Sequence, residues 1–334
     1  MISNQQEGER TSRMKILFVG LGGVGGYYGG KTAKAWEGGK EHEVLFLARG
    51  EHLRAIRENG LHVTAVDEEF VAGPFLASDD PREFGIVDLA VFAVKGYDLK
   101  KAALQAAPAI GAETLVLPLL NGVNSPDILR EVLPQCRMLN GCVYISTRID
   151  APGKVRQTGG NRKMFFGPVS GAAEDLRPVE ELFRKSGIDA SLVENVNEVV
   201  WTKFIFMAPF AGVTSLFGRT FGEVLAGEDS QPMLEGMMRE IRALSELKGV
   251  GLPPDIVELS MAKGVAFPPD TKSSMQLDCE KGRRTEIETF LGFVVREGER
   301  LGTDVHLTRG VYDALRMRSD HPCGCVSEQE GQCP

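Results

Sequence analysis

The segment KILFVGLGGVGGYYGG, residues 15–30, decides the fold prediction, because an apolar run leads directly into a glycine-rich stretch with helical spacing. Three of its glycines have the G-x-G-x-x-G spacing of a turn that joins a strand to a helix and binds the pyrophosphate of a dinucleotide. Gly20 allows the tight turn, Gly22 lets the backbone approach the phosphates, and Gly25 lets helix and strand pack closely. The N–H groups at the start of the helix then face the anion. The segment predicts a dinucleotide site over Gly20, Leu21, Gly22, Gly23, Val24 and Gly25, with a purely structural glycine turn as the alternative.

Three further apolar runs have the pattern of strands buried on both faces: EVLFLA (43–48), DLAVFAV (88–94) and ETLVLPLL (113–120). Segments with helical spacing separate them, at 25–36, 51–60 and 98–110. This alternation predicts βαβ units and a parallel sheet, as in a Rossmann-type dinucleotide-binding domain. We expect the runs at 139–149, 153–159 and 163–168 to add antiparallel strands to the same sheet.

The pattern changes near residue 195, after which apolar residues recur at helical spacing in 196–227, 232–249, 255–265 and 283–302. The fold class is therefore α/β, with an N-terminal Rossmann-type domain over residues 14–194 and an all-helical C-terminal domain over residues 195–318. We expect residues 1–13 and 319–334 to be disordered tails.

The composition is that of an ordinary soluble protein: 334 residues, 43% hydrophobic and 25% charged. A formal net charge of -8 argues against broad binding to nucleic acid or to an anionic membrane, while small anionic ligands stay open. No stretch approaches the ~18 uninterrupted apolar residues of a membrane span, and the polar start lacks a signal-peptide core, so we expect a cytoplasmic protein. A homodimer through the helical half is compatible with the sequence, but no pattern in it indicates one.

The six cysteines, at 136, 142, 279, 323, 325 and 333, form no C-x-x-C pair. We therefore expect reduced thiols and no metal site. A metal or redox role for the three cysteines of the C-terminal tail is the alternative to a frayed terminus.

Polar residues follow three of the predicted strands, where the carboxyl ends of parallel strands border the ligand crevice. Arg49 follows the second strand, where NAD-specific sites carry an acid and an arginine can pair with the 2'-phosphate of NADP, so we expect NADPH as the cofactor. Lys95 and Asn121 follow the strands at 88–94 and 113–120 and are expected to border the cofactor. A solvated Arg49, a loop lysine and an Asn-Gly turn are the respective structural alternatives.

One lysine, Lys203, interrupts the apolar segment EVVWTKFIFMAPFAGV, residues 198–213. On a helix its neighbours at i±3 and i±4 are Val199, Val200, Phe206 and Met207, and such surroundings ease the release of a proton from an ammonium group. Reduction of a ketone needs a hydride on carbon and a proton on the oxygen, so Lys203 is a candidate general acid. The alternative is a lysine whose stem covers apolar surface while its ammonium group reaches water.

Several motifs together resemble the ketopantoate reductases (2-dehydropantoate 2-reductases): MKILFVGLGGVGG, FLARG, FAVKGYD, LNGV, VVWTKF and SSMQLDCEKGRRTEIE, in this order over residues 14–318. The resemblance implies a helical domain like that of 6-phosphogluconate dehydrogenases, an active site in the cleft between the domains, and reduction of 2-dehydropantoate to (R)-pantoate by NADPH for pantothenate and coenzyme A synthesis. It implies that Lys203 is catalytic and binds substrate, that Lys95 and Asn121 lie at nicotinamide and substrate, that Ser274 binds substrate, and that Glu286 lies near cofactor and substrate hydroxyl.

Two of these roles have alternatives in the sequence itself. Glu286 and Glu288 flank the apolar stripe of the helix predicted over 283–302 on opposite sides, and periodicity does not choose between them. Ser273 and Ser274 also have the pattern of helix N-caps.

The chain departs from the family at three positions where better-characterised members carry asparagine. Met207 and Ala211 stand one and two helical turns after Lys203, and Phe221 precedes Gly222. These residues make the expected substrate pocket less polar. Reduction of another, more apolar 2-oxo acid or hydroxy acid therefore stays open. A non-catalytic NADP(H)-binding sensor is a separate alternative; its mark in the sequence would be loss of the lysine or of the acid, and neither is lost.

Overall fold

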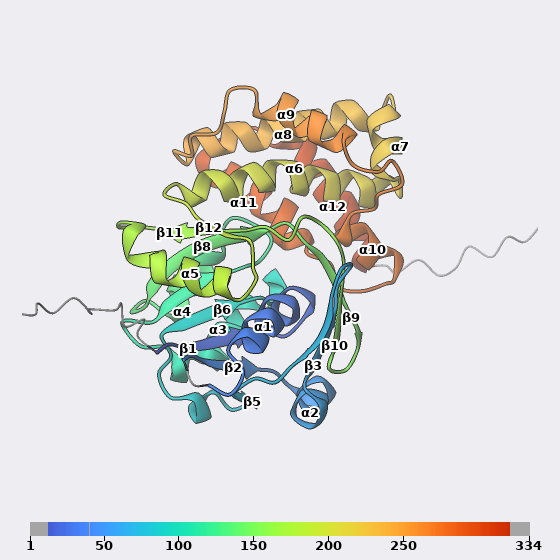
Figure 1. The fold of residues 1–334 in the computed structure, drawn as a ribbon. Helices are drawn as coiled ribbons and strands as arrows, with labels where there is room; N and C mark the ends of the chain where they lie inside the picture. Colours follow the sequence, from blue (N-terminus) through green and yellow to red (C-terminus); the bar gives the residue numbers. More distant parts are fainter. Residues whose placement is uncertain (1–12, 40, 321–334) are drawn as a thin grey trace, which may run out of the picture. The chain divides into compact units, whose positions relative to one another are not determined.

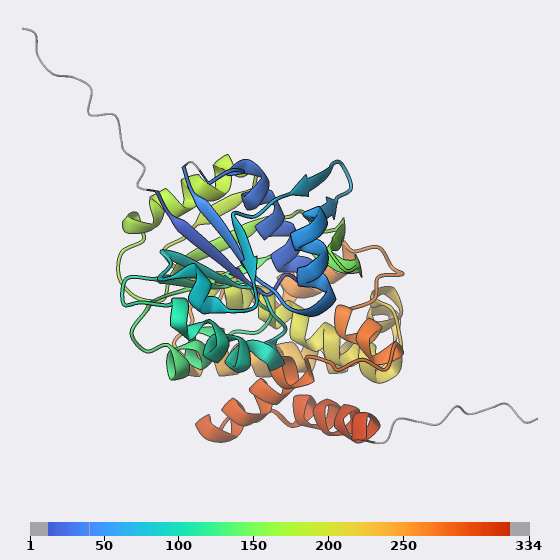
Figure 2. The same cartoon turned by 90° about the horizontal axis from the view of Figure 1, so that it is seen from below.

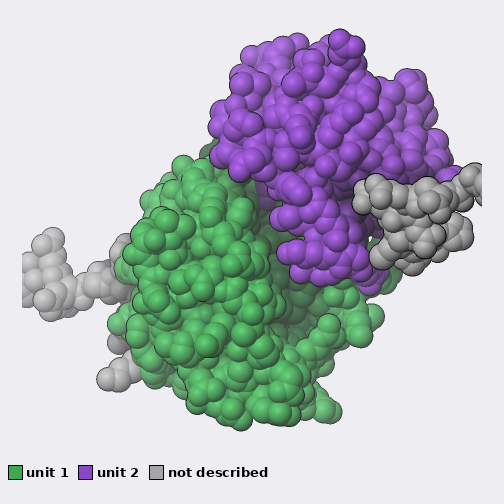
Figure 3. Space-filling model, turned by 90° about the vertical axis from the view of Figure 1, so that its right-hand side faces the viewer, with its two compact units in different colours: residues 1–200 green, residues 201–334 purple. Residues whose placement is uncertain are grey.

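The structure is a computed structural model that describes residues 13–39 and 41–320. Most of the two predicted tails, 1–13 and 319–334, lies outside the described residues. Residues 13, 319 and 320 are described, and residues 319 and 320 belong to the final helix. The chain divides into two compact units, residues 1–200 and 201–334 (Figure 3). The division falls within helix α6 (Val196–Phe217).

Unit 1 contains an eight-stranded sheet in the order β12-β11-β8-β7-β6-β1-β2-β5. Six neighbouring strands of this sheet are parallel, in the order β8-β7-β6-β1-β2-β5. This is the strand order of a doubly wound nucleotide-binding sheet, and it confirms the Rossmann prediction. The strands are β1 (Lys15–Val19), β2 (Glu43–Leu47), β5 (Leu76–Ser78), β6 (Leu89–Phe92), β7 (Leu115–Pro118), β8 (Arg137–Val143), β11 (Met164–Pro168) and β12 (Ala190–Leu192).

Helices cover both faces of this sheet (Figures 1 and 2). Alternate side chains of β1 point to opposite faces, so Ile16 and Phe18 join one core cluster and Leu17 and Val19 the other. The first cluster contains residues of α1 (Gly23–Ala35), α2 (Gly50–Asn59) and α5 (Arg177–Lys185), and the second contains residues of α3 (Leu99–Ala106) and α4 (Ser125–Val132).

A second sheet corrects the sequence prediction. The strands β9 (Ser146–Ala151) and β10 (Lys154–Gly159) do not join the main sheet but pair with β3 (Leu61–Thr64) and β4 (Glu69–Ala72) in the order β4-β3-β10-β9. The two central strands, β3 and β10, alternate buried residues with more exposed ones, so they suit a sheet that is covered on one face only. Of the predicted added strands, β8 and β11 do belong to the main sheet; β8 is parallel to β7 and only the β8–β11 pair is antiparallel.

The glycines of α1 explain how one helix packs between two sheets. A β-carbon on Gly29 would stand 3.1 Å from Phe18 of the main sheet. On the other side, β-carbons on Gly26 and Gly30 would stand 2.5 Å from Val155 and 2.7 Å from Val63 of the second sheet. The absence of side chains at these positions lets both sheets approach the helix backbone.

Unit 2 is helical, as predicted, with α8 in contact with α7, α9, α11 and α12. The predicted helix 196–227 is two helices, because the chain breaks at Gly218, whose φ is 67°. The helix predicted over 283–302 begins later, and its first turn, η5, is π-helical. The elements are α6, α7 (Phe221–Ala226), α8 (Ser230–Leu247), α9 (Ile256–Val265), α10 (Ser274–Glu280), η5 (Glu288–Gly292), α11 (Phe293–Leu301) and α12 (His306–Asp320).

Helix α6 is long and apolar enough, by length and composition, to cross a membrane. However, 78% of its most apolar 18-residue stretch is buried inside the protein, as expected of a helix in a protein core.

Candidate active site

The predicted cofactor residues of unit 1 follow the carboxyl ends of neighbouring parallel strands. The glycine-rich loop follows β1, Arg49 follows β2, Lys95 follows β6 and Asn121 follows β7. The helices after β1 and β6 lie on opposite faces of the sheet, so the connections diverge between these two strands. Such a switch point is where open α/β sheets bind their ligands.

Each glycine of the predicted motif has a distinct environment. Gly20 has φ 89° and donates its N–H to the carbonyl of Leu47 at 3.2 Å. A β-carbon on Gly25 would overlap the carbonyl oxygen of Gly20, whereas a β-carbon on Gly22 would meet no protein atom within 4 Å. The loop thus combines a turn that needs glycine, a close helix–strand contact and a backbone that a ligand can approach.

The N-terminus of α1 fits a phosphate group. Its N-cap residue, Gly22, has no side chain that could cap the N–H groups, and the first turn contains no acidic residue. The half-buried Val24 and the buried Leu21 fix the loop on either side of Gly22 and Gly23. The helix dipole and the N–H groups together favour an anion here.

Among the three arginines near the end of β2, Arg49 differs from the other two. Arg57 donates to the carbonyl of Ala77 at 2.8 Å, and Arg54 pairs with Glu51. Arg49 is exposed at the N-cap of α2. Arg49 therefore has the position, shortly after β2, at which an arginine pairs with the 2'-phosphate in NADP-specific sites of this kind.

Thr147, which no motif in the sequence indicates, is brought to the start of α1 by the second sheet. The Thr147 hydroxyl oxygen stands 2.5 Å from the position of a β-carbon on Gly23. Because β9 was predicted to extend the main sheet, no signal in the sequence placed this hydroxyl beside the glycine-rich loop.

In unit 2, Lys203 is half-buried on α6, and Met207 and Ala211 follow it at successive helical turns. Met207 is half-buried and Ala211 is buried. Residues four apart on a helix are neighbours on one face, so the apolar side chains adjoin the lysine as predicted from their spacing.

Phe221 belongs to an aromatic cluster within unit 2. Its ring stacks on Phe210 with the centroids 4.2 Å apart and also packs against Phe206 and Phe267. Its side chain is therefore part of the core of this unit.

The two serines at the start of α10 have different environments. Ser273 is the N-cap: its hydroxyl accepts the N–H of Gln276 at 3.1 Å and is 2.8 Å from the hydroxyl of Thr214 on α6. Ser274 is the next residue and is exposed. The N-cap alternative therefore applies to Ser273 and leaves the hydroxyl of Ser274 accessible to a ligand.

The two glutamates that periodicity did not separate also differ. Glu288 accepts the hydroxyl of Tyr312 at 2.7 Å and pairs with Arg296 at 2.6 Å. Glu286 is only 4% exposed, and its carbonyl accepts the N–H groups of Thr289 and Phe290 where the helix begins. A π-helical turn begins two residues later, at Glu288, and such turns are frequent at functional sites.

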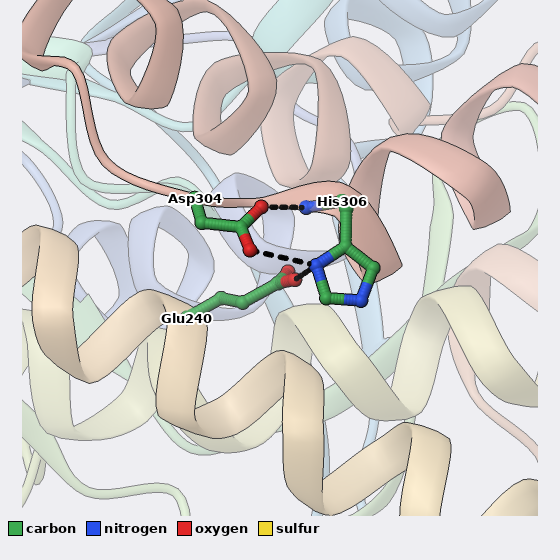
Figure 4. Close-up of side chains that lie close together, drawn as sticks. All are labelled: Glu240, Asp304 and His306. Atoms are coloured by element: carbon green, nitrogen blue, oxygen red, sulfur yellow. Dashed lines mark hydrogen bonds and ion pairs between the residues drawn. The ribbon is translucent and has the colours of Figure 1, made fainter.

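A group of three ionisable side chains elsewhere in unit 2, Glu240, Asp304 and His306, is close enough to hold a cation (Figure 4). However, the Glu240 carboxylate accepts the N–H of Leu307 at 2.8 Å and the N–H and hydroxyl of Thr308 at 2.9 and 2.6 Å. Its oxygens therefore cap the N-terminus of α12, and this contact accounts for a buried carboxylate without a metal.

Two family models and several known proteins match most of the chain. Residues 16–171 match the model "Ketopantoate reductase PanE/ApbA", and residues 195–319 match its C-terminal counterpart. An "uncharacterized oxidoreductase YkpB" of Bacillus subtilis is 30% identical over 91% of this chain and 98% of its own. A 2-dehydropantoate 2-reductase of Mesorhizobium japonicum is 31% identical over 85% of this chain and 91% of its own.

Solved structures show the same fold. The PanE/ApbA family ketopantoate reductase of Ralstonia eutropha has a TM-score of 0.82 and 32% identity, and the match covers 92% of this chain and 99% of that one. A D-mandelate dehydrogenase solved with NADH and anilino(oxo)acetate has a TM-score of 0.80 at 22% identity, covering 92% and 99%. From these matches, the chain belongs to the ketopantoate reductase family, whose members are oxidoreductases that act on CH–OH groups.

Proposed function

We propose that this chain reduces 2-dehydropantoate to (R)-pantoate with NADPH, a step of pantothenate and coenzyme A synthesis. The observation that carries the proposal is the glycine-rich loop at the carboxyl edge of the parallel sheet, with Arg49 rather than an acid after β2. Relatives named 2-dehydropantoate 2-reductase support the substrate. The proposed organisation assigns residues 14–194 to cofactor binding and residues 195–318 to substrate and catalysis.

Gly20 to Gly25 would hold the cofactor pyrophosphate, and Arg49 would pair with the 2'-phosphate. Lys95 and Asn121 would lie at the nicotinamide, and Glu286 near cofactor and substrate hydroxyl. When bound, the reduced nicotinamide supplies a hydride.

The residues of the chain have to manage the charge on the substrate oxygen. A ketone carbon that gains a hydride leaves an alkoxide, which needs a proton or a positive charge. We assign this proton to the ammonium group of Lys203, which is half-buried on an apolar helix. Asn121, Ser274 and Glu286 would orient the substrate.

A second substrate class, a more apolar 2-oxo acid or hydroxy acid, is favoured by Met207 and Ala211 beside Lys203. The likeness in fold to a D-mandelate dehydrogenase agrees with this alternative. Fewer polar groups beside the reacting carbon would weaken the preference for a substrate that carries an additional hydroxyl.

A substrate panel separates the two classes. Oxidation of NADPH and of NADH is followed with 2-dehydropantoate, with branched 2-oxo acids and with an aromatic 2-oxo acid. The proposal expects the highest kcat/KM with 2-dehydropantoate and NADPH. Another acid that exceeds it by orders of magnitude would replace the substrate and leave the reaction class intact.

The proposal includes a cytosolic location. It leaves monomer and homodimer open, and light scattering of the purified chain decides between them.

A further inference from the structure

His52 lies where three elements of unit 1 meet. Its Nδ1 accepts the N–H of Gly153, in the turn between β9 and β10, at 3.0 Å. A β-carbon on Gly153 would stand 2.9 Å from Ala55 of α2, so this turn packs directly on the helix that carries His52. The buried Nε2 of His52 makes no hydrogen bond to a described residue, while the backbone of Leu21 in the glycine-rich loop lies near enough to the ring to raise its pKa.

The contact with Gly153 fixes the protonation of the ring. Because Nδ1 accepts a hydrogen bond, the ring hydrogen is on Nε2 and the imidazole is neutral. Burial lowers the pKa of His52 below its ordinary value of 6.5, and the carbonyl of Leu21 opposes this effect in part.

Charged groups on α2 and on the β9–β10 hairpin pair with one another. On α2, Glu51 and Arg54 pair with each other. On the β9–β10 hairpin, Asp150 pairs with Arg148 and Arg156. Lys154 and His62 are register partners on β10 and β3, and no charged side chain is among the causes of the shift at His52.

The same hairpin carries Thr147, which lies against Gly23 at the start of α1. The hydrogen bond between Gly153 and His52 fixes the turn of this hairpin on α2, and it thereby helps to hold Thr147 beside the N-terminus of α1.

We propose that His52 is a positioning residue of the cofactor site, an inference that rests on the function proposed above. Its neutral ring joins the β9–β10 turn to α2 and lies beside Leu21. It thereby keeps the glycine-rich loop and Thr147 in the arrangement that receives the pyrophosphate.

His42 offers a matched control in the same unit. Its Nδ1 accepts the N–H of Met14 at 3.1 Å, its ring packs on Trp36, and burial lowers its pKa as well. However, Met14 and His42 precede β1 and β2, at the amino edge of the sheet. Loss of His42 should thus affect stability without affecting the cofactor.

The test is a titration of NADPH and NADH fluorescence with the wild-type chain, His52→Ala, His52→Gln and His42→Ala, from about pH 8 to about pH 5.5. NADH is needed because the 2'-phosphate of NADPH itself titrates near pH 6. At pH 8 we expect His52→Ala to raise the Kd of both cofactors severalfold, and at most about tenfold, because binding then has to restore an arrangement that one hydrogen bond holds in the wild type; kcat at saturating NADPH should not change.

The conservative variant separates positioning from general destabilisation. The amide oxygen of a glutamine can accept the N–H of Gly153 but does not titrate. We expect His52→Gln to retain the wild-type Kd at pH 8. It should also lack the weakening of NADH binding that we expect of the wild type as the pH falls through the lowered pKa of His52. If His52→Ala does not fold, this difference in pH profile is sufficient as the test.

Three results are decisive against the inference. A His52→Ala protein with wild-type Kd values, or a His42→Ala protein with the same loss as His52→Ala, overturns the positioning role alone. A wild-type chain that binds neither cofactor overturns the proposed function and this inference with it.

Discussion

Gly25 lies so close to Gly20 that a β-carbon on Gly25 would overlap the Gly20 carbonyl oxygen and stand 3.0 Å from the β-carbon of Ala93. This contact joins α1 to the turn after β1, whereas Gly22 between them has no protein atom within 4 Å of the same position. Gly25 is therefore required for the packing of α1 on the turn, whereas Gly22 leaves the backbone open to a ligand.

We expect Gly25→Ala to destabilise the protein by about 3 kcal/mol, because backbone atoms must move to admit a methyl group. Gly22→Ala should leave the free energy of unfolding within about 0.5 kcal/mol of wild type and still weaken NADPH binding. Urea unfolding and cofactor titration of both variants check this. Equal stability losses in the two variants would contradict the assignment.

The central strands were predictable because their apolar runs are continuous, and α1 was predictable because the first of these runs leads directly into a glycine-rich turn. The second sheet was not, because β3 and β10 are short, amphipathic and far apart in the sequence, so that their parallel pairing leaves no local signal. Similarly, the spacing of Glu286 and Glu288 could not separate them. Their difference comes from Tyr312 on α12, which binds Glu288 through tertiary packing.

Arg49→Ser should affect NADPH and NADH differently. Loss of a charge-assisted contact to the 2'-phosphate should raise the KM for NADPH at least about tenfold and leave that for NADH unchanged. Arg54→Ser is the control, since Arg54 pairs with Glu51. Steady-state kinetics with both cofactors decide, and an equal change for the two would remove Arg49 from the 2'-phosphate site.

The cap on α12 predicts a stability effect in unit 2. Glu240→Gln keeps the size of the side chain but retains only one acceptor oxygen for three donors, so we expect a loss of about 2 kcal/mol. His306→Gln, at an exposed position, should cost much less. A divalent cation that raised the Tm of the wild type but not of Glu240→Gln would instead indicate a metal site.

Glu297 predicts part of the acid sensitivity of unit 2. Hydrogen bonds from Arg300, and from Lys248 at the end of α8, lower its pKa from 4.5 to about 2. A carboxyl with a lowered pKa stabilises the fold above pH 4.5, and the contribution is lost as the pH falls from 4.5 towards 2. Because water screens the group in part, we expect only about 1 kcal/mol.

Unfolding at several pH values tests this assignment. Glu297→Gln should lower stability near neutrality and converge with wild type near pH 2. The exposed pair of Glu299 and Arg309 provides the control variant Glu299→Gln, for which we expect little change. If the free energies of unfolding of Glu297→Gln and wild type differ by the same amount at all pH values, the contacts of Glu297 with Arg300 and Lys248 do not have this role.

The proposed mechanism depends most on Lys203, and the decisive measurement is turnover of NADPH with 2-dehydropantoate and with the best acid of the panel, for wild type and Lys203→Ala. Removal of a general acid that also neutralises the alkoxide should lower kcat about 10²- to 10⁴-fold, while the Kd for NADPH stays within about twofold. A Lys203→Ala protein with near-wild-type turnover would contradict the mechanism. A wild-type chain that binds NADPH but turns over no acid of the panel would favour the non-catalytic sensor.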